Sequence, residues 1–173
     1  MSDIDEFHWR QEKGDADVLL SCGDVSDQAI IEAAQVYGCS IIFAVKGNHD
    51  TKVVFAEPII DLHLRHHIYR GLSFGGLNGA WRYKAQGLFL YSQEEVQALL
   101  VDFPPVDVFL AHNSPRRIHD REDEVHYGFE GLNAYIKRAE PKILIHGHQH
   151  ITRESRLEDT RIIGVYGHQL IEI

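Results

Sequence analysis

Residues 18–50 read VLLSCGDVSDQAIIEAAQVYGCSIIFAVKGNHD, and this stretch decides the fold. Residues 18–21 and 41–45 are apolar runs of strand length, and each is soon followed by a glycine and polar side chains. Between them, Ser26 or Asp27 can cap a helix that Gly38 ends. A strand–helix–strand unit is typical of a mainly parallel sheet, so the pattern predicts an α/β fold.

The rest of the chain continues this alternation. Arg70-Gly71 lies between two apolar stretches and predicts a hairpin, whereas the glycine-rich residues 75–79 predict a tight loop. Ser92 and Glu95 form a capping box that opens a helix. The further expected elements are helices at 93–100 and 129–139 and strands at 106–111, 143–145, 161–165 and 170–173. No repeat or linker interrupts the pattern, so residues 1–173 are expected to form a single domain.

The composition is that of a soluble globular protein, with 44% apolar and 25% charged residues. No apolar run could span a membrane and no signal-peptide core follows Met1, which predicts a cytoplasmic protein. Cys22 and Cys39 adjoin apolar runs and indicate buried thiols rather than a disulfide. The formal charge of −9 disfavours long nucleic acid as a partner, but bound metals would still admit a small phosphorylated substrate. The oligomeric state leaves no signal in the sequence.

Polar side chains gather where the expected strands end, and the 12 histidines of the chain make metal ligation the simplest explanation. Asp24 could bridge two metals, although on its own the Gly23-Asp24 pair favours a turn that caps the helix. Asn48 offers a neutral oxygen ligand. His49 beside it can reach a leaving oxygen, and Asp50 can orient that imidazole.

The remaining candidates are histidines. His112 closes the strand expected at 106–111 and, taken alone, is more typical of a structural hydrogen bond. His148 and His150 follow a glycine and a buried run, and two imidazoles at this spacing can address two neighbouring metals from one turn. His146 is expected to be structural. The histidines without strand-end context are expected at the surface or in packing: His63, His66 and His67.

The combined set resembles, in order and context, the motifs of the calcineurin-like metallophosphoesterases: Asp24, Gly47-Asn48-His49-Asp50, His112 and Gly147-His148-Gln149-His150. The resemblance covers nearly the whole chain and four of the five family motifs. Residues 75–79 with Trp81-Arg82-Tyr83, and the stretch 112–129, are similar to small prokaryotic members of that family.

This resemblance implies a four-layer α/β/β/α sandwich of the metallo-dependent phosphatase type, with a dinuclear metal site at the strand ends. The implied metal ligands are Asp3, Asp24, Asn48, His112, His148 and His150. Asp24 would bridge the ions, and Asp3 and His150 would hold the second one. His49 would be the general acid, steadied by Asp50, and a metal-bound hydroxide would attack phosphorus.

Two departures from the family pattern concern its first motif. Where the family has Asp-x-His, this chain has Asp3-Ile4-Asp5, and His8 lies too far along to replace the histidine. A carboxylate in place of an imidazole favours Mn²⁺ or Mg²⁺ over zinc, so Mn²⁺ is the expected cofactor, with Fe or Zn²⁺ as alternatives. In the family this motif follows an opening strand, but here it begins at residue 3, which leaves no room for that strand. Either the sheet has one strand fewer or the natural chain begins further upstream.

Arg116 and Arg117 follow His112 closely and allow two interpretations. They could contact a substrate phosphate, or they could form an exposed basic pair that balances the acidic residues among 120–124.

The leading hypothesis is a metal-dependent phosphoesterase that acts on a small phosphorylated substrate. Phosphodiesters are favoured over monoesters, because an imidazole acid beside an asparagine ligand suits the expulsion of an alkoxide. The alternative is a non-catalytic scaffold or binding protein that retains the fold with a degraded first metal site. A protein phosphatase is disfavoured because the short chain leaves little material for a docking groove.

Overall fold

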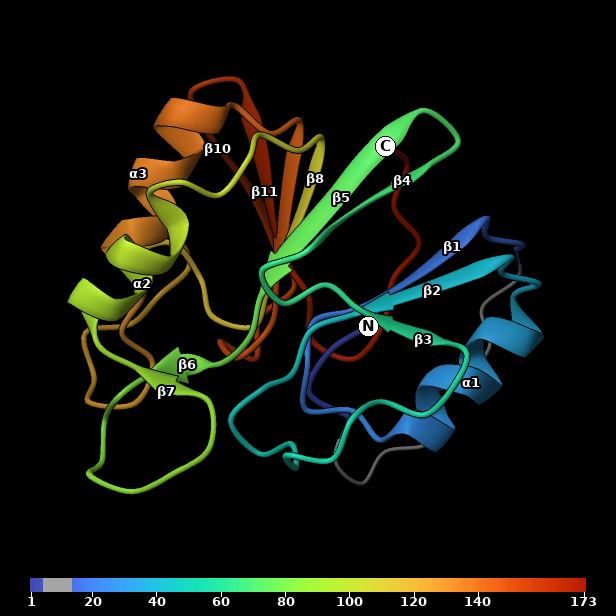
Figure 1. Cartoon of the computed structure of the whole chain (residues 1–173), viewed down its shortest axis with the longest axis horizontal. Coiled ribbons are helices and arrows are strands. Elements are labelled where there is room, and N and C mark those ends of the chain that lie inside the picture. The colour runs from blue at the N-terminus through green and yellow to red at the C-terminus, as the bar shows by residue number, and fades with distance from the viewer. Residues whose placement is uncertain (5–13) are drawn as a thin grey trace.

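The computed structural model describes residues 1–4 and 14–173, and its two larger β-sheets face each other (Figure 1). The three-stranded sheet is parallel, in the order β1-β2-β3. The six-stranded sheet has the order β10-β11-β9-β8-β5-β4 and is parallel except at its two edges. Their strands are β1 (Val18–Ser21), β2 (Ile41–Ala44), β3 (Ile59–Asp61), β4 (His66–Tyr69), β5 (Leu72–Leu77), β8 (Val108–Ala111), β9 (Ile143–His146), β10 (Arg153–Leu157) and β11 (Thr160–Gly164). A separate short pair joins β6 (Ala80–Trp81) to β7 (Leu90–Tyr91).

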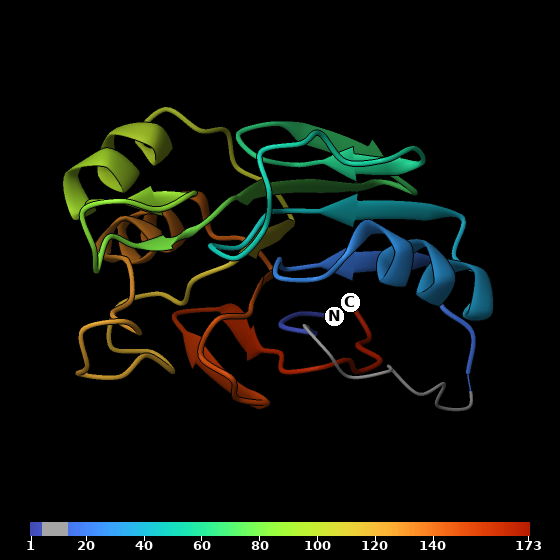
Figure 2. The same ribbon diagram turned by 90° about the horizontal axis from the view of Figure 1, so that it is seen from below.

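Helices cover the outer face of each sheet. Helix α1 (Asp27–Val36) lies on the three-stranded sheet, and α2 (Gln93–Leu100) and α3 (Glu130–Ala139) lie on the six-stranded sheet (Figures 1 and 2). The four-layer α/β/β/α architecture expected from the sequence is therefore confirmed. No helix in the described ranges is both long and apolar enough to cross a membrane.

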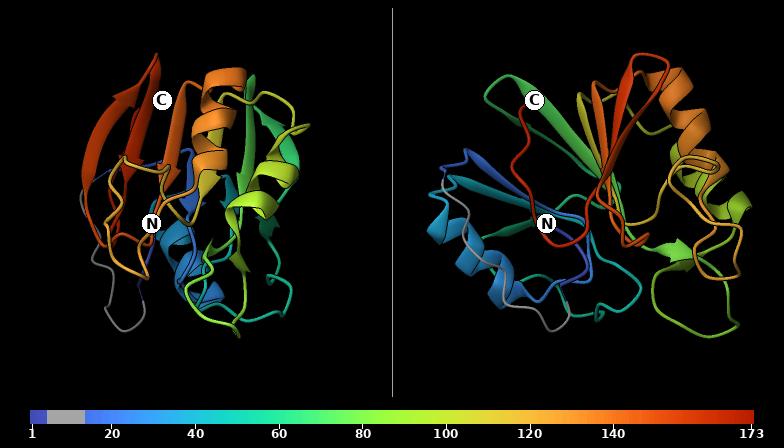
Figure 3. Two further views of the ribbon diagram at one scale, coloured as in Figure 1. Left: turned by 90° about the vertical axis from the view of Figure 1, so that its left-hand side faces the viewer. Right: turned by 180° about the vertical axis from the view of Figure 1, so that it is seen from behind.

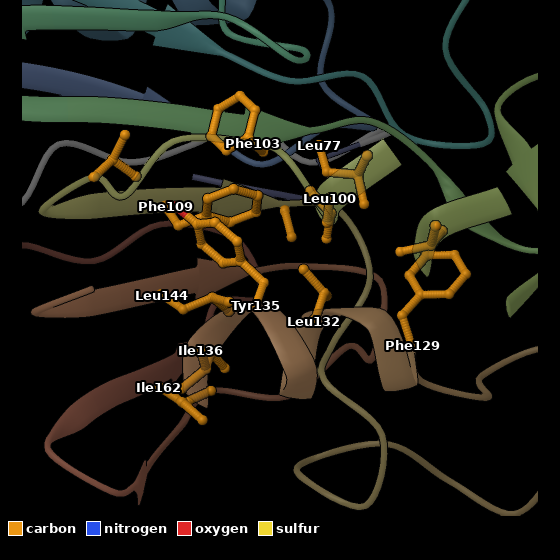
Figure 4. Close-up of a cluster of buried hydrophobic side chains, with 13 residues drawn as sticks. Leu77, Leu100, Phe103, Phe109, Phe129, Leu132, Tyr135, Ile136, Leu144 and Ile162 are labelled. Carbon is orange, nitrogen blue, oxygen red and sulfur yellow. The ribbon is translucent and has the colours of Figure 1, made fainter. Parts of the chain in front are cut away.

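Three clusters of buried apolar side chains join the helices and sheets of this sandwich. One lies between the six-stranded sheet and its helices, where Phe109, Tyr135 and Leu144 are fully buried (Figure 4). A second lies between the two sheets around Phe43 and Phe74, whose ring centroids are 4.8 Å apart. The third packs α1 against the three-stranded sheet. Because burying apolar side chains is the main favourable term in folding, these clusters fix the separation of the sheets.

Local sequence signals explain where the first two helices begin. The Ser26 hydroxyl accepts a hydrogen bond from the Ala29 N–H and caps α1. Ser92 and Glu95 form the expected capping box of α2, with both reciprocal bonds present. The hairpin at Arg70-Gly71 is also confirmed, since β4 and β5 pair in antiparallel fashion on either side of it. These elements were predictable because their signals act over a few residues.

The expected tight loop at residues 75–79 is wrong for residues 75–77, which belong to β5 and pair with β8, and only Asn78 and Gly79 lie outside the strands. Glycine serves close packing here rather than a turn. A Cβ on Gly76 would lie 2.6 Å from Val45 Cγ1 and 2.8 Å from the Leu110 carbonyl oxygen. A Cβ on Gly75 would lie 2.8 Å from the Phe103 ring.

The expectation for the C-terminal tail is half correct. The strand expected at 161–165 is present as β11, but residues 170–173 form no strand. Strand β10 was missed, because its charged sequence lacks the apolar alternation that marks a half-buried strand. As the edge strand of the sheet, β10 is mostly exposed and needs only one paired side.

Gly76→Ala should destabilise the protein by about 1–3 kcal/mol, because the added methyl overpacks the space between the two sheets. Chemical denaturation followed by circular dichroism measures the change. The exposed substitution Ala98→Ser on α2 is the control and should stay within about 0.5 kcal/mol of the parent. A Gly76→Ala protein as stable as the parent would contradict the packing described for β5.

Candidate metal centre

The carboxyl ends of four strands deliver the expected site residues. Asp24 follows β1, Asn48 follows β2, His112 follows β8 and His148 follows β9. The register aligns these ends, since Ser21 pairs with Ala44 and Ala111 pairs with His146. The two sheets approach each other at this end of the strands (Figures 1 and 3). Loops from both sheets therefore meet at one place, as parallel strands require.

Asp3, Asp24 and His112 form the centre of the site. Each offers one ligand atom, and these atoms all lie within 4.8 Å of one another. The three side chains are buried. His112 Nε2 lies 3.3 Å from Asp24 Oδ2 and 3.0 Å from Asn48 Oδ1. Two carboxylates, an amide oxygen and an imidazole thus point into one small volume.

The Nε2 atom of His112 faces this centre, because the other ring nitrogen is engaged elsewhere. Its Nδ1–H donates to the Cys22 carbonyl oxygen at 2.8 Å, which leaves Nε2 facing Asp24 and Asn48. Burial alone would lower the pKa of His112, but the hydrogen bond and charge of Asp24 and the charge of Asp3 raise it to about 9. The metal-free site therefore holds a proton where a cation would otherwise balance the carboxylates.

Asp3 is tied to the loop that carries His148 and His150. Its carboxylate accepts hydrogen bonds from the Ser2 hydroxyl at 2.6 Å and the His148 amide at 2.8 Å. His150 Nε2 lies 3.4 Å from Asp3 Oδ1. Burial would raise the pKa of Asp3, but the bond from His150, the charge of His112 and the other two bonds lower it to about 2. Asp3 is thus a carboxylate at neutral pH.

His148 lies beside His112, with the ring centroids 5.0 Å apart. Its Nε2–H donates to the Val125 carbonyl oxygen at 3.1 Å, so Nδ1 is the nitrogen available for a metal. Burial, with a smaller contribution from the charge of His112, lowers the pKa of His148 to about 3. His148 is therefore neutral, which is the form that binds metals.

Asp50 accepts hydrogen bonds from two backbone amides, a role that the sequence did not suggest. Its Oδ2 accepts hydrogen bonds from the Gly47 N–H at 2.7 Å and the Asp24 N–H at 2.9 Å. The carboxylate thereby ties the loop after β1 to the loop after β2. His49 is exposed, and its backbone N–H donates to Asp24 Oδ1 at 2.9 Å. The orientation of the His49 ring by Asp50 stays a prediction.

Two glycines make room for the ligands. A Cβ on Gly47 would lie 2.1 Å from Asp24 Oδ1 and 2.6 Å from His112 Cε1. A Cβ on Gly147 would lie 1.8 Å from Ser2 Oγ and 2.6 Å from Asp3 Oδ2. Any other residue would push the acidic side chains out of the cluster, so the glycine before each motif is a packing requirement.

The backbone at the site is strained at four of the proposed ligands. Asp3, Asp24, His148 and His150 have φ values of 55°, 55°, 63° and 50°, in the left-handed region that side chains with a Cβ rarely adopt. Each such conformation costs of order 1–3 kcal/mol and persists only when the surroundings enforce it. Its repetition at these four positions indicates a site shaped for a task other than stability.

Arg116 is buried, so the expectation of an exposed basic residue is wrong. Its guanidinium pairs with Asp120 at 2.6 Å and Glu122 at 2.8 Å, and lies 3.7 Å from the ring centroid of Tyr127. The expectation that Arg116 balances nearby acidic residues is confirmed, and its ion pairs with Asp120 and Glu122 link parts of the 115–128 loop. Contact of Arg116 with substrate stays a prediction and would require these ion pairs to open.

Three supporting residues were not predicted from the sequence. Ser2 is fully buried and donates to Asp3, and its position next to a candidate ligand was the only available signal. Gln149 donates from its amide to Asn113 Oδ1, Ser114 Oγ and the His126 carbonyl oxygen. Tyr83 accepts a long hydrogen bond of 3.4 Å from Asn48 Nδ2. The bonds of Gln149 and Tyr83 join segments far apart in the sequence and therefore have no local sequence signature.

One predicted residue lies outside the described part of the chain. Asp5, which stands where the family pattern has histidine, falls in residues 5–13. The six proposed ligands do come together, since Asn48, His148 and His150 each contact a member of the Asp3–Asp24–His112 cluster. Their individual roles stay predictions.

Comparisons with solved structures show the same fold. The crystal structure of the protein TT1561 from Thermus thermophilus has a TM-score of 0.58 at 14% identity, covering 86% of this chain and 76% of that one. A phosphopantetheinyl hydrolase from Mycobacterium tuberculosis has a TM-score of 0.58 at 14% identity, with 86% and 79% covered. A putative 5'-nucleotidase from Staphylococcus aureus has a TM-score of 0.55 at 15% identity, with 84% and 38% covered. No curated protein matches the sequence.

The family model described as calcineurin-like phosphoesterase matches residues 2–152. The matched range contains all six proposed ligands together with His49 and Asp50. The family implies divalent metal ions, and the buried oxygen and nitrogen donors around Asp24 fit such ions. The chain therefore belongs to the calcineurin-like phosphoesterases, a family of metal-dependent phosphoester hydrolases.

Proposed function

We propose that this protein hydrolyses a small phosphodiester with the help of two divalent metal ions, Mn²⁺ being favoured. The placement of Asp24 carries the proposal. Its carboxylate is buried and lies against His112 and Asp3, and its pKa is lowered because the bond and charge of His112 and the amide of His49 outweigh burial. An ionised carboxylate at the meeting point of both sheets is suited to bridging two cations.

We assign the remaining donors to two metal ions, with Asn48, His112 and His148 at one and Asp3 and His150 at the other. The contacts of Asn48 and His148 with His112, and of His150 with Asp3, support this division. When bound, the metal ions would supply Lewis-acid stabilisation of charge on the phosphoryl oxygens. The predominance of oxygen donors in the buried cluster supports Mn²⁺ over softer metals, with Fe or Zn²⁺ as alternatives.

His49 is the proposed proton donor to the leaving oxygen. Its exposed side chain is free to meet a bound substrate, whereas its backbone is fixed by the bond to Asp24. Asp50 would hold the His49 loop in place through the Gly47 and Asp24 amides. A placed acid matters most when the leaving group is an alkoxide, so the proposed substrate is an ester of an alkyl alcohol, and among these we favour small diesters.

A substrate screen tests this function. The Mn²⁺-loaded protein is assayed against matched phosphomonoesters, linear phosphodiesters and cyclic phosphodiesters under one set of conditions. We expect turnover of small diesters above that of monoesters. Faster hydrolysis of monoesters would overturn the diester assignment and leave the phosphoesterase assignment standing.

The competing function is a non-catalytic scaffold or binding protein. The aspartate at position 5, in place of the family's histidine, favours it, because a weakened first motif could leave one metal site incomplete. Metal analysis separates the two. Two bound equivalents with turnover support the enzyme, and one weakly bound equivalent without turnover supports the scaffold.

Metal binding should release about one proton per protein at pH 7.5. His112 has a pKa of about 9 and therefore holds a proton in the metal-free protein, which must leave before Nε2 can bind a cation. Affinity should accordingly rise with pH up to about 9. Calorimetric titration with Mn²⁺ in buffers of different ionisation enthalpy measures the release. An apparent enthalpy that is the same in all buffers would contradict this protonation state.

A further inference from the structure

One imidazole beside the metal centre has no part in the ligand set described above. His126 lies in the 115–128 loop, and its ring centroid is 5.2 Å from that of His148 and 6.3 Å from that of His150. Its side chain is 20% exposed, so it borders the site without being sealed in the core. Because the phosphate of a substrate must lie at the ligands, the groups attached to that phosphate would extend over neighbours such as His126.

The turn that carries His126 is fastened to the last metal motif by two backbone carbonyls. The Val125 carbonyl oxygen accepts the His148 Nε2–H at 3.1 Å, and the His126 carbonyl oxygen accepts the Gln149 side-chain amide at 3.0 Å. The Asp123 carboxylate closes the turn by accepting the Val125 N–H at 3.0 Å and the His126 N–H at 2.7 Å. The backbone of His126 is therefore fixed relative to the proposed ligands.

Asp123 also sets the orientation of the His126 ring. Both of its carboxylate oxygens lie 2.9 Å from Nδ1. A carboxylate can only accept, so Nδ1 carries the hydrogen and Nε2 of this tautomer carries the lone pair. Nε2 makes no hydrogen bond to any residue that the structure describes. The ring thus presents an oriented acceptor, without a partner in the described part of the chain, beside the metal centre.

The side chains next to His126 offer hydrogen bonds rather than a fixed positive charge. Tyr166 stacks on His150, with the ring centroids 4.9 Å apart and the planes at 26°, and 44% of Tyr166 is exposed. A second phosphate or a carboxylate on the substrate would be bound best by Arg or Lys. A hydroxyl group needs no cation and can donate directly to an imidazole nitrogen. This part of the rim therefore suits a hydroxylated alcohol better than a second anionic group.

We propose that His126 is a specificity-determining residue whose Nε2 accepts a hydrogen bond from a hydroxyl group on the alcohol part of the substrate. The inference rests on the proposed function and narrows its substrate class to small phosphodiesters in which an alcohol bears a further hydroxyl group. Asp123 is a positioning residue, because it acts through the His126 ring. A single hydrogen bond to a partly exposed acceptor should give a preference of about 3- to 10-fold over an analogue without the hydroxyl.

A binding experiment tests this proposal without requiring turnover. The Mn²⁺-loaded protein is titrated with glycerol phosphate and with propyl phosphate, which differ only in their hydroxyl groups. We expect the parent to bind glycerol phosphate about 3- to 10-fold more tightly, and His126→Ala to bind both compounds equally. Glu124→Ala changes an exposed residue of the same turn and is the matched control, which should keep the preference. His126→Gln retains an acceptor oxygen and should keep part of it.

Kinetics separate this proposal from the proposed function. Two diesters with a common nitrophenyl group are compared, one a glyceryl and the other a propyl ester, and the parent should favour the glyceryl ester in kcat/KM. A binding preference without hydrolysis would refute the phosphodiesterase assignment and leave the role of His126 standing. Equal binding of the two phosphates by the parent would overturn that role, and so would a preference that survives in His126→Ala. Loss of bound metal from His126→Ala would overturn it too, by assigning the imidazole to the metal ligands.

Discussion

Asp24→Asn is expected to reduce phosphoester hydrolysis by about 10³-fold or more, equivalent to about 4 kcal/mol in the activation barrier. The change keeps the shape of the side chain and a carbonyl oxygen that can still accept the His49 N–H. It removes the charge that faces both Asp3 and His112. Because the proposed role of Asp24 is to bridge two cations, Mn²⁺ affinity should fall by about 100-fold or more.

The exposed substitution Asp159→Asn is the matched control and should change neither turnover nor metal affinity. Metal content is measured on the purified proteins, and circular dichroism checks that both variants fold. An Asp24→Asn protein that binds two equivalents of Mn²⁺ as tightly as the parent would show that the metals are held elsewhere.

His49→Ala should differ from Asp24→Asn, because it should lose most of its turnover while its metal content stays unchanged. Loss of a positioned general acid costs about 10²–10⁴-fold. The loss should be largest for substrates with an alkoxide leaving group and smaller for nitrophenyl esters, because nitrophenolate leaves without a proton. Since the His49 side chain is exposed and makes no part of the buried cluster, its removal should leave the ligands in place.

His66→Ala is the control for His49, because it removes another exposed histidine that is not among the proposed site residues. Kinetics with paired alkyl and nitrophenyl diesters are compared for both variants. Parent-like hydrolysis of the alkyl diester by His49→Ala would refute the acid role.

Asp50→Ala should differ from both His49→Ala and His66→Ala by lowering metal affinity, since Asp50 ties together the loops that carry Asp24 and Asn48.

The sequence predicted the parts of the fold that have local signals. The α1 cap at Ser26, the α2 capping box and the turn at Arg70-Gly71 depend on residues a few positions apart. The meeting of the site loops was predictable for a related reason, because parallel strands place their carboxyl ends at the same edge. The family resemblance then supplied the order of the ligands.

The parts that could not be predicted depend on contacts between distant segments. Gly75 and Gly76 read as a loop because glycine is common in turns, whereas here β5 uses them to approach Phe103 and Val45. The burial of Arg116 follows from Tyr127 and two acidic partners in its own loop, and composition does not reveal that packing. The bonds from Asp50 to two backbone amides likewise require the folded arrangement of two loops.

The most direct test of the central claim combines a Mn²⁺ titration with turnover measured on the same sample. The account predicts that two equivalents bind and that hydrolysis of a small phosphodiester rises with occupancy of the second. In the Asp24→Asn protein both signals should be lost together. Binding of at most one weak equivalent, with no phosphoester hydrolysed at any metal concentration, would contradict the account and favour a scaffold that keeps only the fold.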